Sequence, residues 1–146
     1  MTHHPLYLQG DYNTVDKKPA AVISDALTIL SSQWNDANST LPSDQRIPVA
    51  TTINAAVMGG RAINAASGSE SMLRLLEHWA GVELRFAGSD LSPWGSHEAT
   101  SDAALNAYRP PNRVWSFDTA LTDLSALPPG TPLFFWKIQA LWTEEQ

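Results

Sequence analysis

Short runs that alternate apolar and polar residues recur along the chain and predict β-strands. Residues 82–88 alternate strictly, and residues 51–58 alternate and end at a pair of glycines. Residues 6–9 are a shorter apolar run that stops at a cluster of turn-forming residues. A period of two is the pattern of a strand with one buried face, and glycines commonly end such strands. We therefore predict strands at these three places and a fourth at residues 133–142.

Residues 20–34 fit two structures. Their apolar side chains recur at helical spacing, at Ile23, Leu27, Leu30 and Trp34. The same segment also reads as two short strands, residues 21–23 and 26–30, that meet at Ser24 and Asp25. We favour the two strands, and a helix over residues 20–34 remains the alternative. The polar segment that follows, residues 33–48, is predicted to be an exposed loop.

One helix is predicted at about residues 69–80. Met72, Leu75 and Trp79 form one apolar face at helical spacing. Ser69 can cap the amino end of this helix, and Gly81 can end it.

Two proline-bearing stretches, residues 108–118 and 127–132, predict stiff extended arms. Proline fixes φ and lacks an N–H, so neither stretch can form a helix interior or a central strand. The large apolar side chains of the first arm should pack across the body of the fold. The residues expected to build these arms are Pro110, Pro111, Asn112, Arg113, Trp115, Asp118, Pro128, Pro129, Gly130 and Pro132.

The predicted strands end repeatedly at small or corner-forming residues, among them Gly10, Asp25 and Gly88. This recurrence predicts a mainly β fold, a short β-solenoid-like stack of strands with one capping helix and proline-rich straps. An α+β fold with the second helix at residues 20–34 is the alternative. The length of 146 residues fits a single domain, with flexible ends at residues 1–5 and 143–146.

Composition narrows the possible partners. The formal charge of −6 argues against a nucleic-acid backbone as the main partner, because that requires a basic surface. The absence of cysteine excludes disulfides and thiolate metal sites. No apolar run is long enough to cross a bilayer, and the first residues do not form a signal peptide. We therefore expect either a cytosolic chain or, preferably, a domain cut from a longer exported precursor.

No arrangement of residues predicts catalysis, a metal or a cofactor. Serine never occurs in a nucleophile motif, and the histidines lack the spacing of metal ligands. Asp11 and Asn13 could hold Ca²⁺ through their oxygens, although a local turn stabilised by Asp11 explains them better. We therefore expect a protein that is not an enzyme.

Exposed aromatic and basic residues are the candidates for binding. Trp94, which lies between a proline and a glycine, is the tryptophan most expected to be exposed, and Tyr108 and Arg109 begin the first proline arm. The other tryptophans, Trp79 and Trp115 included, should be buried. Arg113, which has Asp118 close by in the sequence, should be partly buried and paired with a carboxylate.

The chain also resembles the C-terminal region of large exported bacterial proteins of the PilX type, which are pilus-assembly or minor-pilin-like proteins. The resemblance covers nearly the whole chain in order. Its motifs are Leu6-Tyr7-Leu8-Gln9-Gly10-Asp11-Tyr12-Asn13, Lys18-Pro19-Ala20-Ala21-Val22-Ile23-Ser24-Asp25-Ala26, Leu30-Ser31-Ser32-Gln33-Trp34, Thr51-Thr52-Ile53-Asn54-Ala55-Ala56, Leu76-Glu77-His78-Trp79, Pro110-Pro111-Asn112-Arg113-Val114-Trp115-Ser116-Phe117-Asp118 and Leu127-Pro128-Pro129-Gly130-Thr131-Pro132.

The resemblance implies an extracellular or cell-surface location. The family's hydrophobic pilin-like helix, the repetitive β stretch that follows it and a Gly-Gly-x-Glu-Asn motif are missing here, so direct membrane insertion is not expected. The first strand then lacks a neighbour, and Leu6, Tyr7 and Leu8 become a candidate edge for pairing with another chain.

Together these observations predict a non-enzymatic structural or interaction domain of an extracellular filament, pilus or surface assembly. Its partners would be other protein chains, with self-association one possibility, and its contacts would be strand edges and aromatic side chains. The alternative is an adhesive module that binds glycan or DNA through exposed aromatics.

Overall fold

The computed structural model describes residues 1–60, 73–93, 95, 96, 109–129 and 131. Within these ranges the strands form two parallel sheets, one with the order β1-β3-β5 and one with the order β2-β4-β6-β7. The strands are β1 (Leu6–Gln9), β2 (Ala21–Ser24), β3 (Leu27–Leu30), β4 (Thr51–Gly59), β5 (Leu73–Leu75), β6 (Glu83–Leu91) and β7 (Asn112–Ser116). The helices described are the short 3₁₀ turns η1 (Asp36–Asn38), η2 (Ser43–Gln45) and η4 (Thr119–Thr122).

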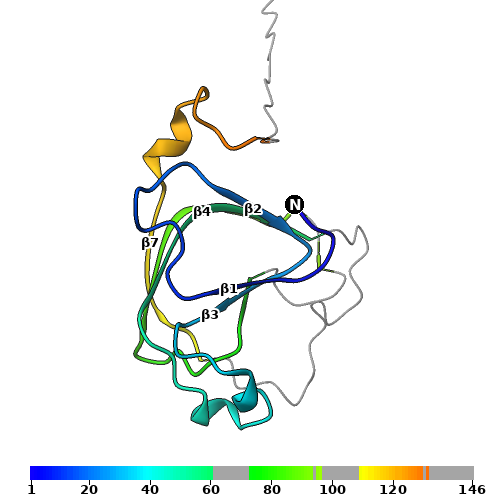
Figure 1. Ribbon diagram of the computed structural model, residues 1–146, viewed down its shortest axis with the longest axis vertical. Coiled ribbons are helices and arrows are strands. Elements are labelled where there is room, and N and C mark those ends of the chain that lie inside the picture. The colour runs from blue at the N-terminus through cyan, green and yellow to red at the C-terminus, as the bar shows by residue number, and fades with distance from the viewer. Residues whose placement is uncertain (61–72, 94, 97–108, 130, 132–146) are drawn as a thin grey trace, which may run out of the picture.

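The chain passes from one sheet to the other as it advances. β1, β3 and β5 belong to the first sheet, and β2, β4 and β6 alternate with them in the second. Parallel neighbours need a long crossover connection, which in most proteins contains a helix. In the connections from β1 to β3, β2 to β4, β3 to β5 and β4 to β6, the crossover contains a strand of the facing sheet instead. The two sheets therefore face each other across the core and come together where β2 turns into β3 at Asp25 and Ala26 (Figure 1).

Alternation along the long strands creates the buried face of the second sheet. In β4 every second residue, from Thr51 to Gly59, is buried, and the residues between them are half-buried. β-Branched side chains such as Ile53 and Val57 suit this position, because they pack well on a pleated surface. The strand therefore contributes Ile53, Ala55 and Val57 to the core.

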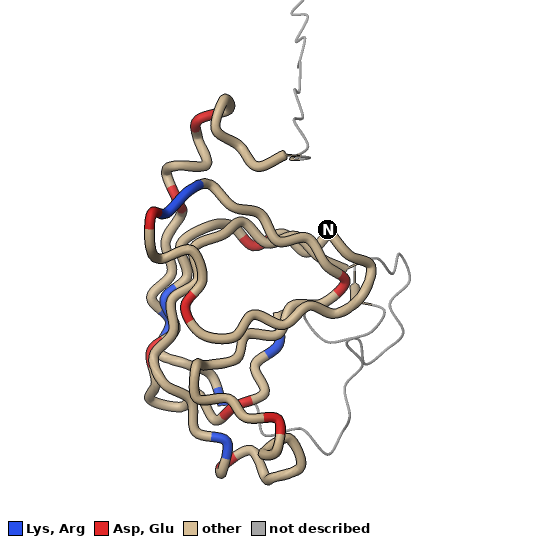
Figure 2. Tube along the Cα trace, viewed as in Figure 1, with Lys and Arg blue, Asp and Glu red and all other residues tan. Residues whose placement is uncertain are grey.

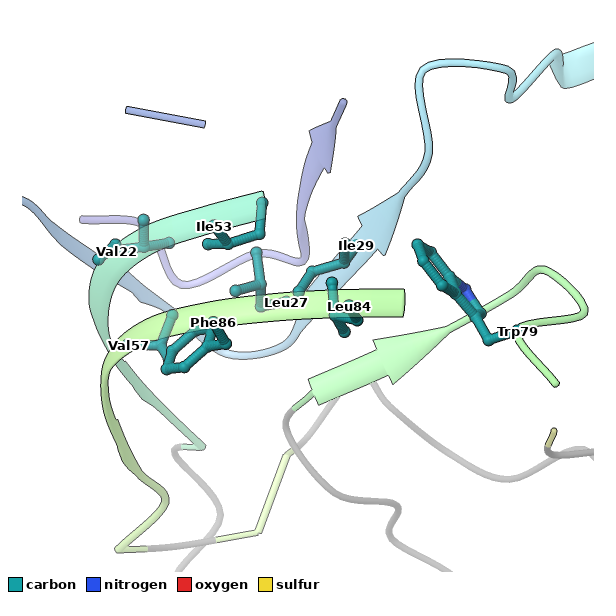
Figure 3. Close-up of a cluster of buried hydrophobic side chains, with 9 residues drawn as sticks. Val22, Leu27, Ile29, Ile53, Val57, Trp79, Leu84 and Phe86 are labelled. Atoms are coloured by element: carbon teal, nitrogen blue, oxygen red, sulfur yellow. The ribbon is translucent and has the colours of Figure 1, made fainter. Parts of the chain in front are cut away.

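Because the strands are parallel and in register, similar side chains on neighbouring strands lie side by side across each sheet. Leu6, Leu27 and Leu73 occupy equivalent positions of β1, β3 and β5. In the other sheet Ile53 of β4 is level with Phe86 of β6. Figure 3 shows the side chains of both sheets meeting in one cluster, which contains Val22, Leu27, Ile29, Ile53, Ala55, Val57, Trp79, Leu84 and Phe86.

Gly88 of β6 is level with Ala55 of β4 and lies close to its backbone. A Cβ atom at this position would lie 1.8 Å from the carbonyl oxygen of Ala55, which no real contact allows. Glycine is therefore required here by the approach of the neighbouring backbone, since its φ is not in the left-handed region.

The predicted helix at residues 69–80 is wrong over its described part. Leu73–Leu75 is strand β5, and no residue from 76 to 80 is helical. The helical spacing of Leu75 and Trp79 is overridden because Leu73 and Leu75 lie in register with Leu27 and Ile29 of β3. Burial in a sheet outweighs the weak local preference for helix.

The alternative helix at residues 20–34 is also absent. Two strands, β2 and β3, occupy this segment and belong to different sheets. Ser24 and Asp25 form the corner between them, where Ser24 Oγ donates to the Ala26 carbonyl at 3.0 Å. Both faces of β3 are buried, so its residues do not alternate between apolar and polar. Such a run cannot be distinguished from a buried helix by periodicity alone.

The predicted β-solenoid is wrong as well. The described residues form two separate sheets of three and four strands that do not close, an arrangement of parallel sheets closer to that of α/β proteins. The sequence pattern overestimated the regularity of the fold. β4 and β6 span nine residues each while β5 spans three, so successive strands are not equivalent repeats.

The first proline arm contains an edge strand. Pro111 is buried, and the residues that follow it form β7, which pairs in parallel with β6. Asn112 begins this pairing through an N–H that donates to the Val82 carbonyl at 2.8 Å. In the second arm Thr131 closes a turn by donating its N–H and hydroxyl to the Pro128 carbonyl, at 3.1 and 2.6 Å. Pro129 is exposed, whereas Gly130, Pro132 and the predicted strand at residues 133–142 lie outside the described residues.

Candidate functional site

The outer edge of β1 presents backbone groups to the surroundings. Leu6 N–H donates to the Ala26 carbonyl at 2.8 Å, and Gly10 N–H donates to the Leu30 carbonyl at 2.8 Å. Because alternate residues of a strand direct their backbone groups to the same neighbour, Leu8 also faces β3. Tyr7 and Gln9 then direct their N–H and C=O groups away from β3, toward an edge that no described strand covers.

Apolar side chains of the core reach the surface beside this edge. Leu6 and Leu8 pack against the core but remain half-buried, while Leu27 and Ile29 of the adjacent strand are completely buried. The side chain of Tyr7 lies on the opposite face of the sheet and is 58% exposed. A strand added to the outer edge of β1 would therefore bury Leu6 and Leu8, in the same way that β1 helps to bury Leu27 and Ile29 of β3.

The same end of the core is bordered by Tyr12 and Ala20, which are also half-buried and packed against it. Tyr12 forms a parallel bridge with Ile53 of β4. Neither residue was among the predicted binding residues. Polar neighbours surround Tyr12, so local alternation does not mark it, and its position depends on pairing with a strand about forty residues later in the sequence.

The turn after β1 holds this end of the molecule in place. Gly10 has a φ of 73° and Asn13 a φ of 56°, both in the left-handed region that favours these residue types. Asp11 Oδ1 accepts the N–H of Thr52 at 2.7 Å. The carboxylate thus connects the turn to β4, whereas a local Asx turn had been predicted, and Asn13 bonds with both Lys18 and Asn54.

The outer edge of β2, which is an edge strand of the second sheet, is partly covered. Ile23 in the outer edge of β2 accepts a hydrogen bond from the N–H of Thr2 at 3.0 Å, so the first residues of the chain cover part of that edge. β1 is thus the more accessible of the two edges.

The predicted aromatic and basic candidates do not come together as one described site. Trp94 and Tyr108 lie outside the described residues. Arg109 is exposed at the start of the first proline arm, in a segment distant in the sequence from Leu6, Tyr7 and Leu8. Their roles in binding stay predictions.

Arg113 and Trp115 interact with each other on β7. The Arg113 guanidinium lies over the Trp115 ring, 4.9 Å from its centroid, and Trp115 contacts Phe86 with a centroid separation of 5.7 Å. Trp115 is 43% exposed, more than its predicted burial, because β7 is the last strand of its sheet. Arg113 is exposed, so its predicted partial burial is wrong. Asp118 pairs with Lys17.

Three other predicted structural residues are buried. Asp25 is 2% exposed and accepts a hydrogen bond from Ser96 Oγ at 2.7 Å. Asp118 is 4% exposed, accepts Lys17 Nζ at 3.0 Å and caps η4 through the N–H of Ala120. Trp79 is completely buried against the core, next to Ile29 (Figure 3).

The described part of the chain contains no group of three or more His, Asp or Glu side chains that could hold a metal ion. Within the same residues, no helix is long and apolar enough to span a bilayer. Comparison of the chain with protein-family models, curated proteins and solved structures finds no match.

Proposed function

We propose that this chain is a non-enzymatic structural or interaction domain that joins other protein chains, a second copy of itself included, by strand addition at the outer edge of β1. The observation that carries the proposal is the combination of outward-facing backbone groups at Tyr7 and Gln9 with the half-buried side chains of Leu6 and Leu8. Strand addition is a common mode of recognition, in which backbone hydrogen bonds give affinity and alternate side chains give specificity.

The composition of β1 supports this choice of edge. Natural proteins protect exposed edges with charged residues, proline or bulges. β1 has the sequence Leu-Tyr-Leu-Gln and contains none of these, and neither β1 nor β3 carries a charged residue (Figure 2). β7, the edge strand at the far side of the other sheet, carries the charged residue Arg113.

Strand addition at this edge would gain backbone hydrogen bonds and buried apolar surface, which must exceed the entropic cost of association. Each new backbone hydrogen bond contributes about 0.5–1.5 kcal/mol net, and covering a half-buried leucine adds about 1 kcal/mol. Two copies can pair their β1 edges about a two-fold axis, since the same surface then serves both partners. The filament, pilus or surface assembly in which such pairing operates is proposed from the PilX-type resemblance.

The test is Tyr7→Pro. The Tyr7 N–H points away from β3, so proline removes an outward donor and leaves the β1–β3 hydrogen bonds in place. We expect the unmodified chain to form dimers or larger species as its concentration rises in analytical ultracentrifugation, with slowed amide exchange at Tyr7 and Gln9. The Tyr7→Pro chain should remain monomeric with an unchanged far-UV circular dichroism spectrum.

Two control variants distinguish the loss of the Tyr7 N–H from the loss of the tyrosine side chain and from a general effect of proline. Tyr7→Ser keeps the N–H and should still associate. Ala21→Pro places proline on the outer edge of β2, since the Ala20 carbonyl accepts from Ala56 and the next residue faces outward, and it should also still associate. A chain that stays monomeric at every concentration and exchanges both β1 amides rapidly would refute the proposal. Binding of glycan or DNA by such a monomer would establish the adhesive alternative.

A further inference from the structure

Arg46 is buried in a segment predicted to be an exposed loop. The residue follows η2, where its N–H donates to the Ser43 carbonyl at 3.1 Å, and it is 8% exposed. The carbonyl of Arg46 accepts the N–H of His78 at 2.8 Å. Arg46 is thereby held beside the segment that connects β5 to β6.

The positive charge of Arg46 has no partner among the described residues. No described carboxylate lies within 4 Å of its guanidinium, no described group forms a hydrogen bond with its side chain, and its Nε atom is shielded from solvent. Glu77 precedes His78 in the sequence, but its two oxygens accept the N–H and the hydroxyl of Ser31, at 2.6 and 2.7 Å. A buried charge normally requires a counter-charge together with hydrogen bonds.

Two nitrogen atoms on the adjoining segment lack partners in the same way. Nδ1 of His78 and Nε1 of Trp79 are both shielded from solvent without a hydrogen bond to any described residue. The indole N–H can only donate, and a buried tryptophan normally finds an acceptor. Its ring nitrogen lies on the side of the indole that faces away from Ile29 (Figure 3).

We propose that Arg46, together with His78 and Trp79, forms a binding site for a small oxyanion, either a phosphate-type group or a carboxylate. The two segments are joined by the bond between the Arg46 carbonyl and His78, and each carries unsatisfied nitrogen atoms. A planar guanidinium binds two oxygens of one such anion side by side, and the indole N–H supplies a neutral donor. Water could satisfy the indole and the imidazole but would leave the arginine charge uncompensated.

Thermal denaturation with added anions tests the site. Sodium phosphate, sulfate, acetate and chloride are compared at equal ionic strength. An anion that binds the folded chain should raise Tm by about 3–6 °C at ten times its dissociation constant. A response to phosphate and sulfate supports a phosphate-type ligand, and a response to acetate alone supports a carboxylate. Equal Tm values in all four salts would overturn the proposal.

Variants identify the residues responsible, with isothermal titration of phosphate or acetate as the direct measurement. Arg46→Met should weaken binding at least about tenfold, since it removes a charged donor. Trp79→Phe removes the indole N–H and should weaken anion binding less than Arg46→Met does. If one of the two variants fails to fold, the other still tests the site. Arg85→Gln, which alters an exposed arginine paired with Glu83, is the matched control and should bind like the unmodified chain. Unchanged affinity in folded Arg46→Met would refute the assignment.

Discussion

Asn13 and Asn54 exchange hydrogen bonds between their side chains and each other's backbone. Nδ2 of Asn13 donates to the Asn54 carbonyl at 2.9 Å, and Nδ2 of Asn54 donates to the Asn13 carbonyl at 3.0 Å. Asn13 also binds both backbone groups of Lys18, through an acceptor bond at 3.1 Å and a donor bond at 2.6 Å. The pair fastens the turn after β1 to β4 and thereby fixes the position of the proposed pairing edge.

Replacing Asn54 by alanine should destabilise the chain by about 1–2 kcal/mol, because the half-buried carbonyl of Asn13 loses its donor. Urea denaturation measures this change as a lower midpoint with an unchanged slope. Thr14→Ala, in the exposed part of the same turn, is the control and should shift the midpoint little. Equal midpoints for the Asn54→Ala and Thr14→Ala chains would show that the exchange of bonds contributes nothing.

Gly88→Ala should cost about 3 kcal/mol or more, since the new methyl group would collide with the backbone of Ala55. The strands cannot relieve this collision by rotating a side chain. Gly81→Ala is the matched control. Gly81 has a φ of 80° with open space around it, so alanine there should cost only about 1 kcal/mol of backbone strain. Urea midpoints of the two variants give the comparison, and the reverse order would contradict it.

Glu77→Gln should destabilise the chain by about 2–3 kcal/mol. The Glu77 carboxylate is 4% exposed and accepts two hydrogen bonds from Ser31, and an amide replaces one of these acceptors with a donor. Glu83→Gln removes the charge of an exposed carboxylate paired with Arg85 and should cost less than about 1 kcal/mol. Chemical denaturation of both variants at pH 7 measures the difference. A loss at Glu77 no larger than that at Glu83 would mean that the buried bonds are not stabilising.

The contribution of Asp90 to the free energy of unfolding should be less favourable at neutral pH than in acid. Partial burial raises the pKa of its carboxyl above the ordinary value of 3.8, so the folded chain holds this proton more tightly than the unfolded chain does. The stabilising contribution of the protonated group is complete below pH 3.8 and is lost as the pH rises through the raised pKa. Asp90→Asn should therefore raise Tm at pH 7, and the gain should shrink as the solution is acidified.

Asp123 provides the control of opposite sign. Hydrogen bonds from the hydroxyl and N–H of Ser125 lower the pKa of this carboxyl, so its contribution is present above pH 3.8 and is lost as the pH falls through the lowered pKa. Asp123→Asn should lower Tm slightly at pH 7, and this loss should disappear in acid. Melting curves of both variants between pH 3 and pH 7 measure the two slopes. Identical pH profiles for the two variants would contradict the assignment to Asp90.

Alternation located the strands because it reflects burial of one face, which is a local property of the sequence. β1, β4 and β6 lie where alternation or an apolar run placed them, and the two strands favoured for residues 20–34 are present. The helix predicted at residues 69–80 failed because Leu73 and Leu75 take their structure from β3, some 45 residues earlier in the chain. No local window contains that information.

The site could be predicted only in part for the same reason. The apolar run predicted a strand at Leu6, Tyr7 and Leu8, and the β stretch missing relative to the PilX-type family made that strand a candidate edge. The bridge between Tyr12 and Ile53 was not predicted. Arg46 was missed because its polar surroundings in the sequence indicated an exposed loop. Its burial depends on the segment around His78, whose N–H binds its carbonyl.

The ion pair between Lys17 and Asp118 connects residues 101 positions apart in the sequence. During synthesis on the ribosome, the turn that contains Lys17 emerges early. Its partner Asp118 is added only after most of the described chain has been synthesised. Contacts between such distant residues form slowly, because the intervening chain must be ordered first. Nascent chains that end before residue 118 would lack this fastening while the edge of β1 is already exposed, and they should be the species most in need of chaperones.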